Sequence, residues 1–196
     1  MLPTRRPGCF QCCPARPHAG FSRRRTVVAV VRSVPEPQLK TRLKEIIAKL
    51  YRLPTSGRRQ VFALSRAEAE QLPNLPSLAI ISVIAPDRSP AMLEGVQYLL
   101  RLSFADVDFD NPALSERARR KIPNAFRPEH AREIHEFVAQ LPETVTSIVV
   151  HCEGGFSRSA AIALGLAEIY GYAVSVRDPD SANSSVLRSL REAFPA

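Results

Sequence analysis

The residue types best suited to chemistry in this 196-residue chain lie together in the stretch His151–Ser159. Cys152 precedes two glycines and is followed six residues later by Arg158. Glycines let a loop turn tightly, so that successive backbone N–H groups point inward and bind an anion. The same N–H groups stabilise a thiolate, which is the nucleophilic form of cysteine. We therefore expect a phosphate-binding loop with Cys152 as the nucleophile and Arg158 holding two phosphate oxygens.

The neighbours of Cys152 and Arg158 have supporting roles in this prediction. We expect the Ser159 hydroxyl to donate a hydrogen bond to the sulfur, which makes the sulfur a better leaving group. We expect His151 to order Cys152 by hydrogen bonding rather than to act as a base. Phe156 packs either against an aromatic leaving group or into the base of the loop. The residues expected to surround the phosphate are Glu153, Gly154, Gly155, Phe156, Ser157 and Arg158.

The elements that must position this loop are short apolar strands alternating with helices, from residue 61 onward. Such alternation predicts an α/β fold with a mostly parallel central sheet of four to five strands, flanked by helices. Sites in such folds lie at the carboxyl ends of the strands, where Cys152 stands. The predicted strands are 61–64, 78–84, 97–104 and 147–150. The predicted helices are 66–70 after a Ser65 cap, 92–95, 128–141, 159–170 and 183–193.

The stretch His151–Ser159 resembles the signature of the protein tyrosine phosphatases: histidine, cysteine, two residues, glycine, two residues, arginine, serine. It is most similar to the compact dual-specificity branch, which includes small bacterial members. The resemblance covers about residues 61–195 and is strongest at 147–165. It implies a dual-specificity phosphatase-like fold and hydrolysis of phosphomonoesters through a phosphocysteine intermediate, with no cofactor and no metal.

The resemblance also implies an aspartic acid on a separate loop, which protonates the leaving oxygen and then activates water. The family pattern of an apolar strand, Phe, one residue and the acid fits Phe104-Ala105-Asp106. Asp106 is therefore the first candidate for the general acid, and Asp108 is the second. The alternative is that Asp106, Asp108 and Asp110 form solvated surface or a weak cation site.

The segment between the candidate acid and Cys152 departs from the compact family pattern. Residues 107–126 lengthen the spacing between Asp106 and Cys152, so the position of the acid relative to the loop depends on how this segment folds. Residues 117–121 of the segment are basic except for Ala118. This cluster either forms a solvated helix face or recruits a phosphorylated partner.

Positive charge is concentrated near the N-terminus, although the whole chain carries a net charge of +8. Residues 1–60 hold 14 of the 27 Lys and Arg residues and two of the 19 acidic residues, so the remainder has a net charge of −4. A mildly acidic body argues against nucleic acid as a partner of the folded domain. The resemblance to the phosphatases implies instead that the substrate is a phosphorylated protein or a small phosphomonoester. Glu153 in the loop disfavours polyanionic phosphoinositides.

Composition divides the chain into a basic, partly disordered tail, residues 1–58, and a phosphatase domain, residues 59–196. The Arg-rich start also resembles an organelle transit peptide, although its Arg and Pro clusters favour a plain tail. Apolar residues at helical spacing between Leu39 and Leu53 predict one amphipathic helix, which packs on its own domain, a membrane surface or a partner. Pro54 and Gly57 indicate a linker.

Cysteine usage indicates a reducing compartment, so we expect a cytoplasmic protein. Cys9, Cys12 and Cys13 crowd the tail, and a chain of this length needs no disulfide framework. Their spacing resembles that of metal ligands, but no paired Cys or His set follows, so we expect no metal site. No apolar run approaches the roughly 20 residues of a transmembrane helix.

Two other classes of protein remain open. One is a pseudophosphatase, a module that binds phosphate but has lost turnover, which a misplaced Asp106 would support. The other is a sulfurtransferase of the rhodanese type, which also uses a loop cysteine. The histidine before Cys152 and the serine after Arg158 favour phosphatase chemistry.

Overall fold

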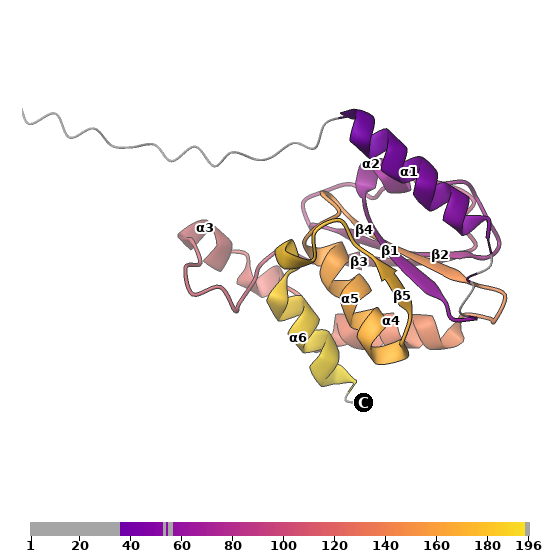
Figure 1. Ribbon diagram of the computed structural model, residues 1–196. Helices are drawn as coiled ribbons and strands as arrows, with labels where there is room; N and C mark the ends of the chain where they lie inside the picture. The colour runs from indigo at the N-terminus through magenta and orange to yellow at the C-terminus, as the bar shows by residue number, and fades with distance from the viewer. Residues whose placement is uncertain (1–35, 53, 55–56, 195–196) are drawn as a thin grey trace, which may run out of the picture. The chain divides into compact units, whose positions relative to one another are not determined.

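The computed structural model describes residues 36–52, 54 and 57–194 (Figure 1). The chain divides into two compact units, Met1–Val34 and Pro35–Ala196. The first unit lies outside the described residues. So do the predictions made for it, which are the disordered tail, the transit-peptide alternative and the three tail cysteines.

The second unit is an α/β structure whose five-stranded sheet is parallel throughout, in the order β3-β2-β4-β1-β5. The predicted fold class is therefore confirmed. Strand β4 lies at the centre, and all six of its residues are buried. The strands are β1 (Gln60–Ser65), β2 (Leu78–Ile84), β3 (Tyr98–Ser103), β4 (Ser147–Cys152) and β5 (Ala173–Ser175).

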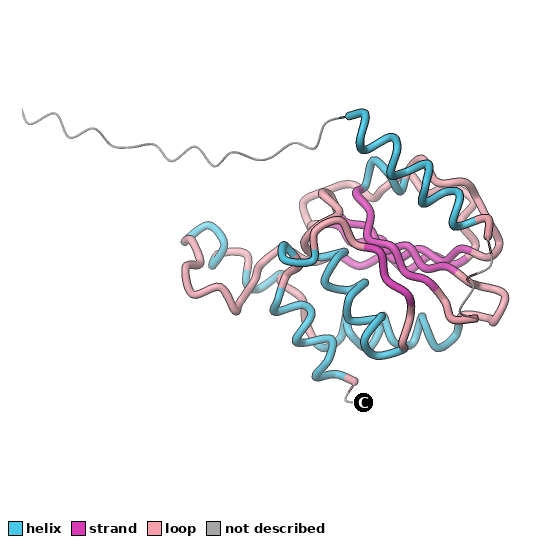
Figure 2. Tube along the Cα trace, viewed as in Figure 1, coloured by secondary structure: helices cyan, strands magenta, loops and turns pink. Residues whose placement is uncertain are grey.

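Helices cover both faces of the sheet because its strands are apolar on both sides (Figure 2). Along β1, Val61 and Ala63 pack against α4, α5 and α6, whereas Phe62 and Leu64 pack toward α1 and α2. The helices are α1 (Glu36–Leu50), α2 (Arg66–Ala69), α3 (Glu116–Arg119), α4 (Pro128–Gln140), α5 (Arg158–Tyr170) and α6 (Ser184–Ala193). Two 3₁₀ turns, η1 (Ile122–Asn124) and η2 (Pro179–Ser181), complete the elements.

Helix α1 belongs to the same compact unit as the sheet, and the predicted division at residue 58 into a tail and a phosphatase domain stays a prediction. Leu43, Ile46 and Leu50 are buried, and Ile46 and Leu50 join the core cluster that contains Phe62. The predicted amphipathic stripe thus packs on its own domain. The unit that contains the sheet begins at Pro35.

Two local predictions differ from the structure. Residues 92–95 do not form a helix, and only 94–95 form a turn, because four residues between Pro90 and Gly95 offer too few helical hydrogen bonds. Strand β5 was not predicted, because its three residues are too short for a visible alternation pattern. Gly171, with φ 67°, ends α5 and turns the chain directly into β5.

No helix in the part of the chain that the structure describes has the length and hydrophobicity needed to span a membrane.

Candidate active site

The loop that carries Cys152 joins the carboxyl end of the central strand β4 to the first turn of α5. The Cys152 side chain is buried, and its Sγ atom accepts a hydrogen bond from the Gly155 N–H at 3.3 Å. The Ser159 hydroxyl lies 3.2 Å from the same sulfur. The sulfur is therefore held between one backbone N–H group and one hydroxyl group, next to the N-terminus of α5.

Gly155 is required by the path of the loop. Its φ of 79° lies in the left-handed region that favours glycine. A Cβ atom at this position would lie 2.4 Å from the Ser65 nitrogen and 2.6 Å from the Leu64 carbonyl carbon. Both of these are backbone atoms at the end of β1, so they have little freedom to move. The loop therefore packs on the end of β1 as closely as a glycine permits.

Replacing Gly155 with alanine is expected to lower the free energy of unfolding by about 2 kcal/mol or more, because the new Cβ combines backbone strain with a backbone clash. Urea denaturation measures this change. Gly154→Ala is the matched control, since the three atoms nearest to a Cβ there all belong to the exposed Phe156 ring, which can rotate away. Equal destabilisation by the two substitutions would contradict this account of the loop.

The Arg158 side chain is 95% buried, with 5% of its surface exposed. Its Nη1 atom donates to the Phe104 carbonyl oxygen at 2.8 Å, and the guanidinium lies 5.9 Å from the centre of the Phe104 ring. Its buried Nε atom has no hydrogen-bond partner among the described residues. A buried guanidinium donor without an acceptor is costly unless a ligand supplies one, and a phosphate oxygen is a fitting acceptor.

Asp106 lies at the same loop although it is 46 residues before Cys152 in the sequence. Its Oδ1 atom accepts hydrogen bonds from the Ser157 hydroxyl at 2.8 Å and from the Asn183 amide at 2.9 Å. Its Oδ2 atom lies 3.7 Å from the Arg158 Nε atom. The carboxyl group is partly exposed, so a proton donor at this position reaches both the loop and the solvent.

The two other aspartates of this segment have different partners. Asp108 accepts from the Ser184 hydroxyl and from the Ser185 N–H at 3.1 Å, and these hydrogen bonds hold the pKa of Asp108 below its usual value against the opposing effect of burial. Asp110 forms an ion pair with Arg188 at 2.9 Å. Both residues therefore fasten the segment to α6, whereas Asp106 faces the loop.

His151 is completely buried in β4, and burial lowers the pKa of its imidazole to about 4. The ring is therefore neutral at pH 7 and a weak base, which agrees with the expectation that it does not act as the base. Neither ring nitrogen makes a hydrogen bond of normal geometry within the described chain. The proposed ordering of Cys152 by His151 stays a prediction.

The remaining loop residues predicted to surround the phosphate differ in exposure and in contacts. Glu153 is exposed and lies 4.0 Å from the Arg66 guanidinium. Phe156 is 46% exposed, and its ring lies over Gly154 rather than in the base of the loop. The other role considered for Phe156, contact with an aromatic leaving group, stays a prediction. The Ser157 side chain is engaged by Asp106.

Two residues that contact or support the site, Asn183 and Glu68, were not predicted from the sequence. Asn183 caps α6 by accepting from the Val186 N–H, and its amide also binds Asp106. A cap was visible in the sequence, because an asparagine precedes a predicted helix, but the second contact was not.

The buried Glu68 carboxylate was the other missed residue. It accepts from the Ser65 N–H and hydroxyl and pairs with Arg42 and Arg177 at 3.0 Å each. Since the Ser65 backbone lies against Gly155, this network holds in place the end of β1 on which the loop packs. The Ser-x-x-Glu pattern at 65–68 signals the cap but not the two arginines.

A cavity of about 350 Å³ lies beside the loop and is lined by both Asp106 and Arg158. The loops that follow β2 and β3 supply most of the other lining residues. The cavity thus lies at the carboxyl edge of the parallel sheet, where α/β folds bind their ligands.

Comparison of the chain with models of known protein families found no match, and comparison with curated proteins found none either.

Proposed function

We propose that this protein is a tyrosine or dual-specificity phosphatase, which hydrolyses phosphomonoesters of phosphorylated proteins through a phosphocysteine intermediate. The observation that carries the proposal is the convergence of three groups on one loop. These are the Cys152 sulfur, the buried Arg158 guanidinium, whose Nε atom makes no hydrogen bond within the described chain, and the Asp106 carboxyl group. The three groups match the needs of phosphoryl transfer, which are a nucleophile, a clamp on the phosphate oxygens and a proton donor.

In the first step the Cys152 thiolate attacks phosphorus, and a sulfur–phosphorus bond forms as the bond to the leaving oxygen breaks. Asp106 donates its proton to that oxygen, so that the product leaves as an alcohol or phenol. Arg158 and the loop N–H groups hold the phosphate oxygens during the transfer.

In the second step Asp106, now a carboxylate, takes a proton from water as the water oxygen attacks phosphorus. The sulfur–phosphorus bond breaks, and inorganic phosphate is released. The Ser159 hydroxyl, 3.2 Å from the sulfur, donates to the thiolate as it forms and makes it a better leaving group.

Two observations favour this proposal over the alternatives. A pseudophosphatase would be supported by a displaced acid, but the Asp106 carboxyl group lies 3.7 Å from Arg158. A sulfurtransferase has no use for a proton donor at the loop or for a hydroxyl at the cysteine sulfur. Cys152 is a free thiol, and such a nucleophile works in a reducing compartment, so we propose that the protein acts in the cytoplasm.

The direct test is hydrolysis of p-nitrophenyl phosphate by the wild-type protein with EDTA present. We expect p-nitrophenol release that EDTA does not reduce, together with a phosphate-labelled protein after a rapid acid quench. Sulfur transfer from thiosulfate to cyanide in the absence of phosphatase activity would favour the rhodanese type. Binding of inorganic phosphate without any hydrolysis would identify a pseudophosphatase.

A further inference from the structure

The cavity beside the loop has a cationic side outside the catalytic groups. Arg88, from the loop after β2, and Arg117 and Lys121, from the segment around α3, line it together with Arg158. All three side chains are exposed, and none has a hydrogen-bond or ion-pair partner among the residues that the structure describes. We call Arg88, Arg117 and Lys121 the cationic rim.

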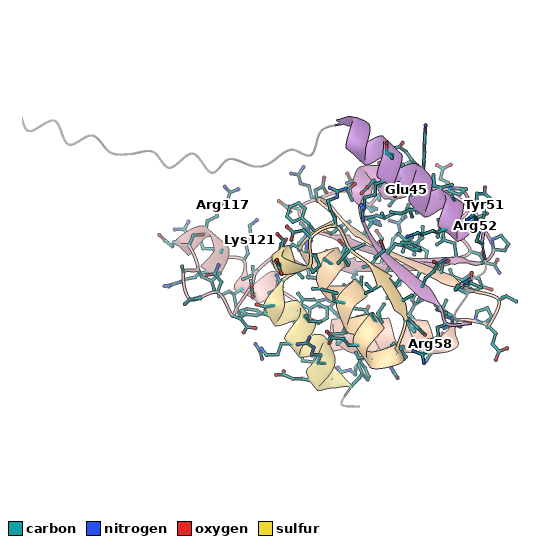
Figure 3. The ribbon with its side chains drawn as sticks, in the orientation of Figure 1. Glu45, Tyr51, Arg52, Arg58, Arg117 and Lys121 are labelled. Atoms are coloured by element: carbon teal, nitrogen blue, oxygen red, sulfur yellow. The ribbon has the colours of Figure 1, made fainter. Side chains whose placement is uncertain are left out.

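One basic neighbour of the rim in the α3 segment, Arg120, differs from the rim residues because its charge is paired. Arg120 is engaged by Glu116 at 2.6 Å. Arg117 and Lys121 lie four residues apart, so they share one side of the helix and the turn that follows it. Figure 3 shows both side chains projecting from this segment. Two like charges at this spacing repel each other, and an anion between them removes that cost.

The acidic residues of the cavity do not neutralise the rim. Asp106 is held by Ser157 and Asn183, and Glu153 lies near Arg66. Asp87 is the remaining acid of the cavity lining. Outside the catalytic groups, the lining therefore presents three cations against one carboxylate that lacks a basic partner in the described chain.

We propose that the cationic rim binds a second anionic group of a phosphopeptide, located on a residue next to the one whose phosphate occupies the Cys152 loop. This inference rests on the proposed function, and it narrows the substrate to phosphopeptides with an acidic or phosphorylated neighbouring residue. Arg158 holds the first phosphate, and the rim recognises the flanking charge.

A peptide fits this arrangement better than a compact polyanion. The rim side chains come from two separate segments, the loop after β2 and the α3 segment, as suits an extended chain that crosses the cavity. Glu153 within the loop repels additional phosphates held close to the first on one small ring. Long, exposed side chains at the cavity wall reach a neighbouring residue of the peptide instead.

The test measures dissociation constants of three fluorescent phosphotyrosine peptides with the Cys152→Ser protein, which does not consume them. The peptides differ only in the flanking residue, which is alanine, glutamate or phosphoserine. The same measurements are made after adding Arg117→Ala, Lys121→Ala or both. Arg119→Ala is the matched control, because it removes one positive charge from the same exposed segment but does not line the cavity.

Each single rim substitution is expected to weaken binding of the two anionic peptides about threefold, and the double substitution about tenfold. The alanine peptide and the Arg119→Ala protein should change less than twofold, and 0.5 M salt should reduce the preference. Phosphoserine binding more tightly than glutamate would identify a doubly phosphorylated substrate, whereas equal binding would identify an acidic flank.

Equal binding of all three peptides, or a preference that survives the double substitution, would overturn the inference. Tighter binding to phosphoinositide vesicles than to any peptide would overturn the assignment to peptides. Hydrolysis of p-nitrophenyl phosphate, which has no second anion, reports separately on the proposed function. A protein that binds the anionic peptides but does not hydrolyse p-nitrophenyl phosphate would therefore contradict the proposed function and not the binding role of the rim.

Discussion

Replacing Cys152 with serine is expected to reduce kcat/KM for p-nitrophenyl phosphate by a factor of at least about 10⁴. The serine hydroxyl has nearly the same shape as the thiol, but it stays protonated at neutral pH and is a weak nucleophile without an adjacent base. His151 does not supply that base, because burial lowers its pKa to about 4. The measurement is the initial rate of p-nitrophenol release, with EDTA present throughout.

The loop should survive this substitution, which makes the result specific for chemistry. The Gly155 N–H and the Ser159 hydroxyl, the two contacts of the sulfur, both remain available to a serine oxygen. Inorganic phosphate should therefore still raise the melting temperature of the variant, because a ligand that binds the native state stabilises it. Hydrolysis at more than a hundredth of the wild-type rate, with phosphate binding intact, would remove Cys152 from the mechanism.

Replacing Asp106 with asparagine is expected to reduce kcat/KM about 100-fold with a phosphotyrosine peptide, because asparagine has no proton to give to the leaving oxygen. The loss should be smaller with p-nitrophenyl phosphate. A nitrophenolate is a much weaker base than the tyrosine phenolate, whose pKa is about 10, and needs less protonation as it leaves.

Asp108→Asn is the matched control for this experiment. It makes the same chemical change two residues along the chain, but Asp108 binds the start of α6 rather than facing the loop. We expect its rate to stay within about threefold of the wild type and its stability to fall by about 1 kcal/mol. A larger rate loss in Asp108→Asn than in Asp106→Asn would transfer the role of general acid to Asp108.

The predictability of the fold varies with the length and pattern of each element. The apolar run at 78–84 and the helix that starts at Pro128 were predicted within a few residues, because hydrophobic periodicity and local caps specify them. Strand β5 was not predicted, because three residues at the edge of a sheet are held by their pairing with β1. The placement of α1 was left open, because the same apolar stripe suits a membrane, a partner or this sheet.

The sequence by itself determined the loop between β4 and α5, since the strand, Cys152, the glycines, Arg158 and the helix follow one another without interruption. The prediction that this loop binds an anion depends mainly on these neighbouring residues. Only the tertiary structure decided which aspartate lies beside Ser157 and Arg158, and that Asn183 and the cationic rim lie at the same edge. These contacts join segments far apart in the chain, and their distances depend on how β3, α3 and α6 pack at the end of the sheet. Patterns within a short stretch of sequence do not specify that packing.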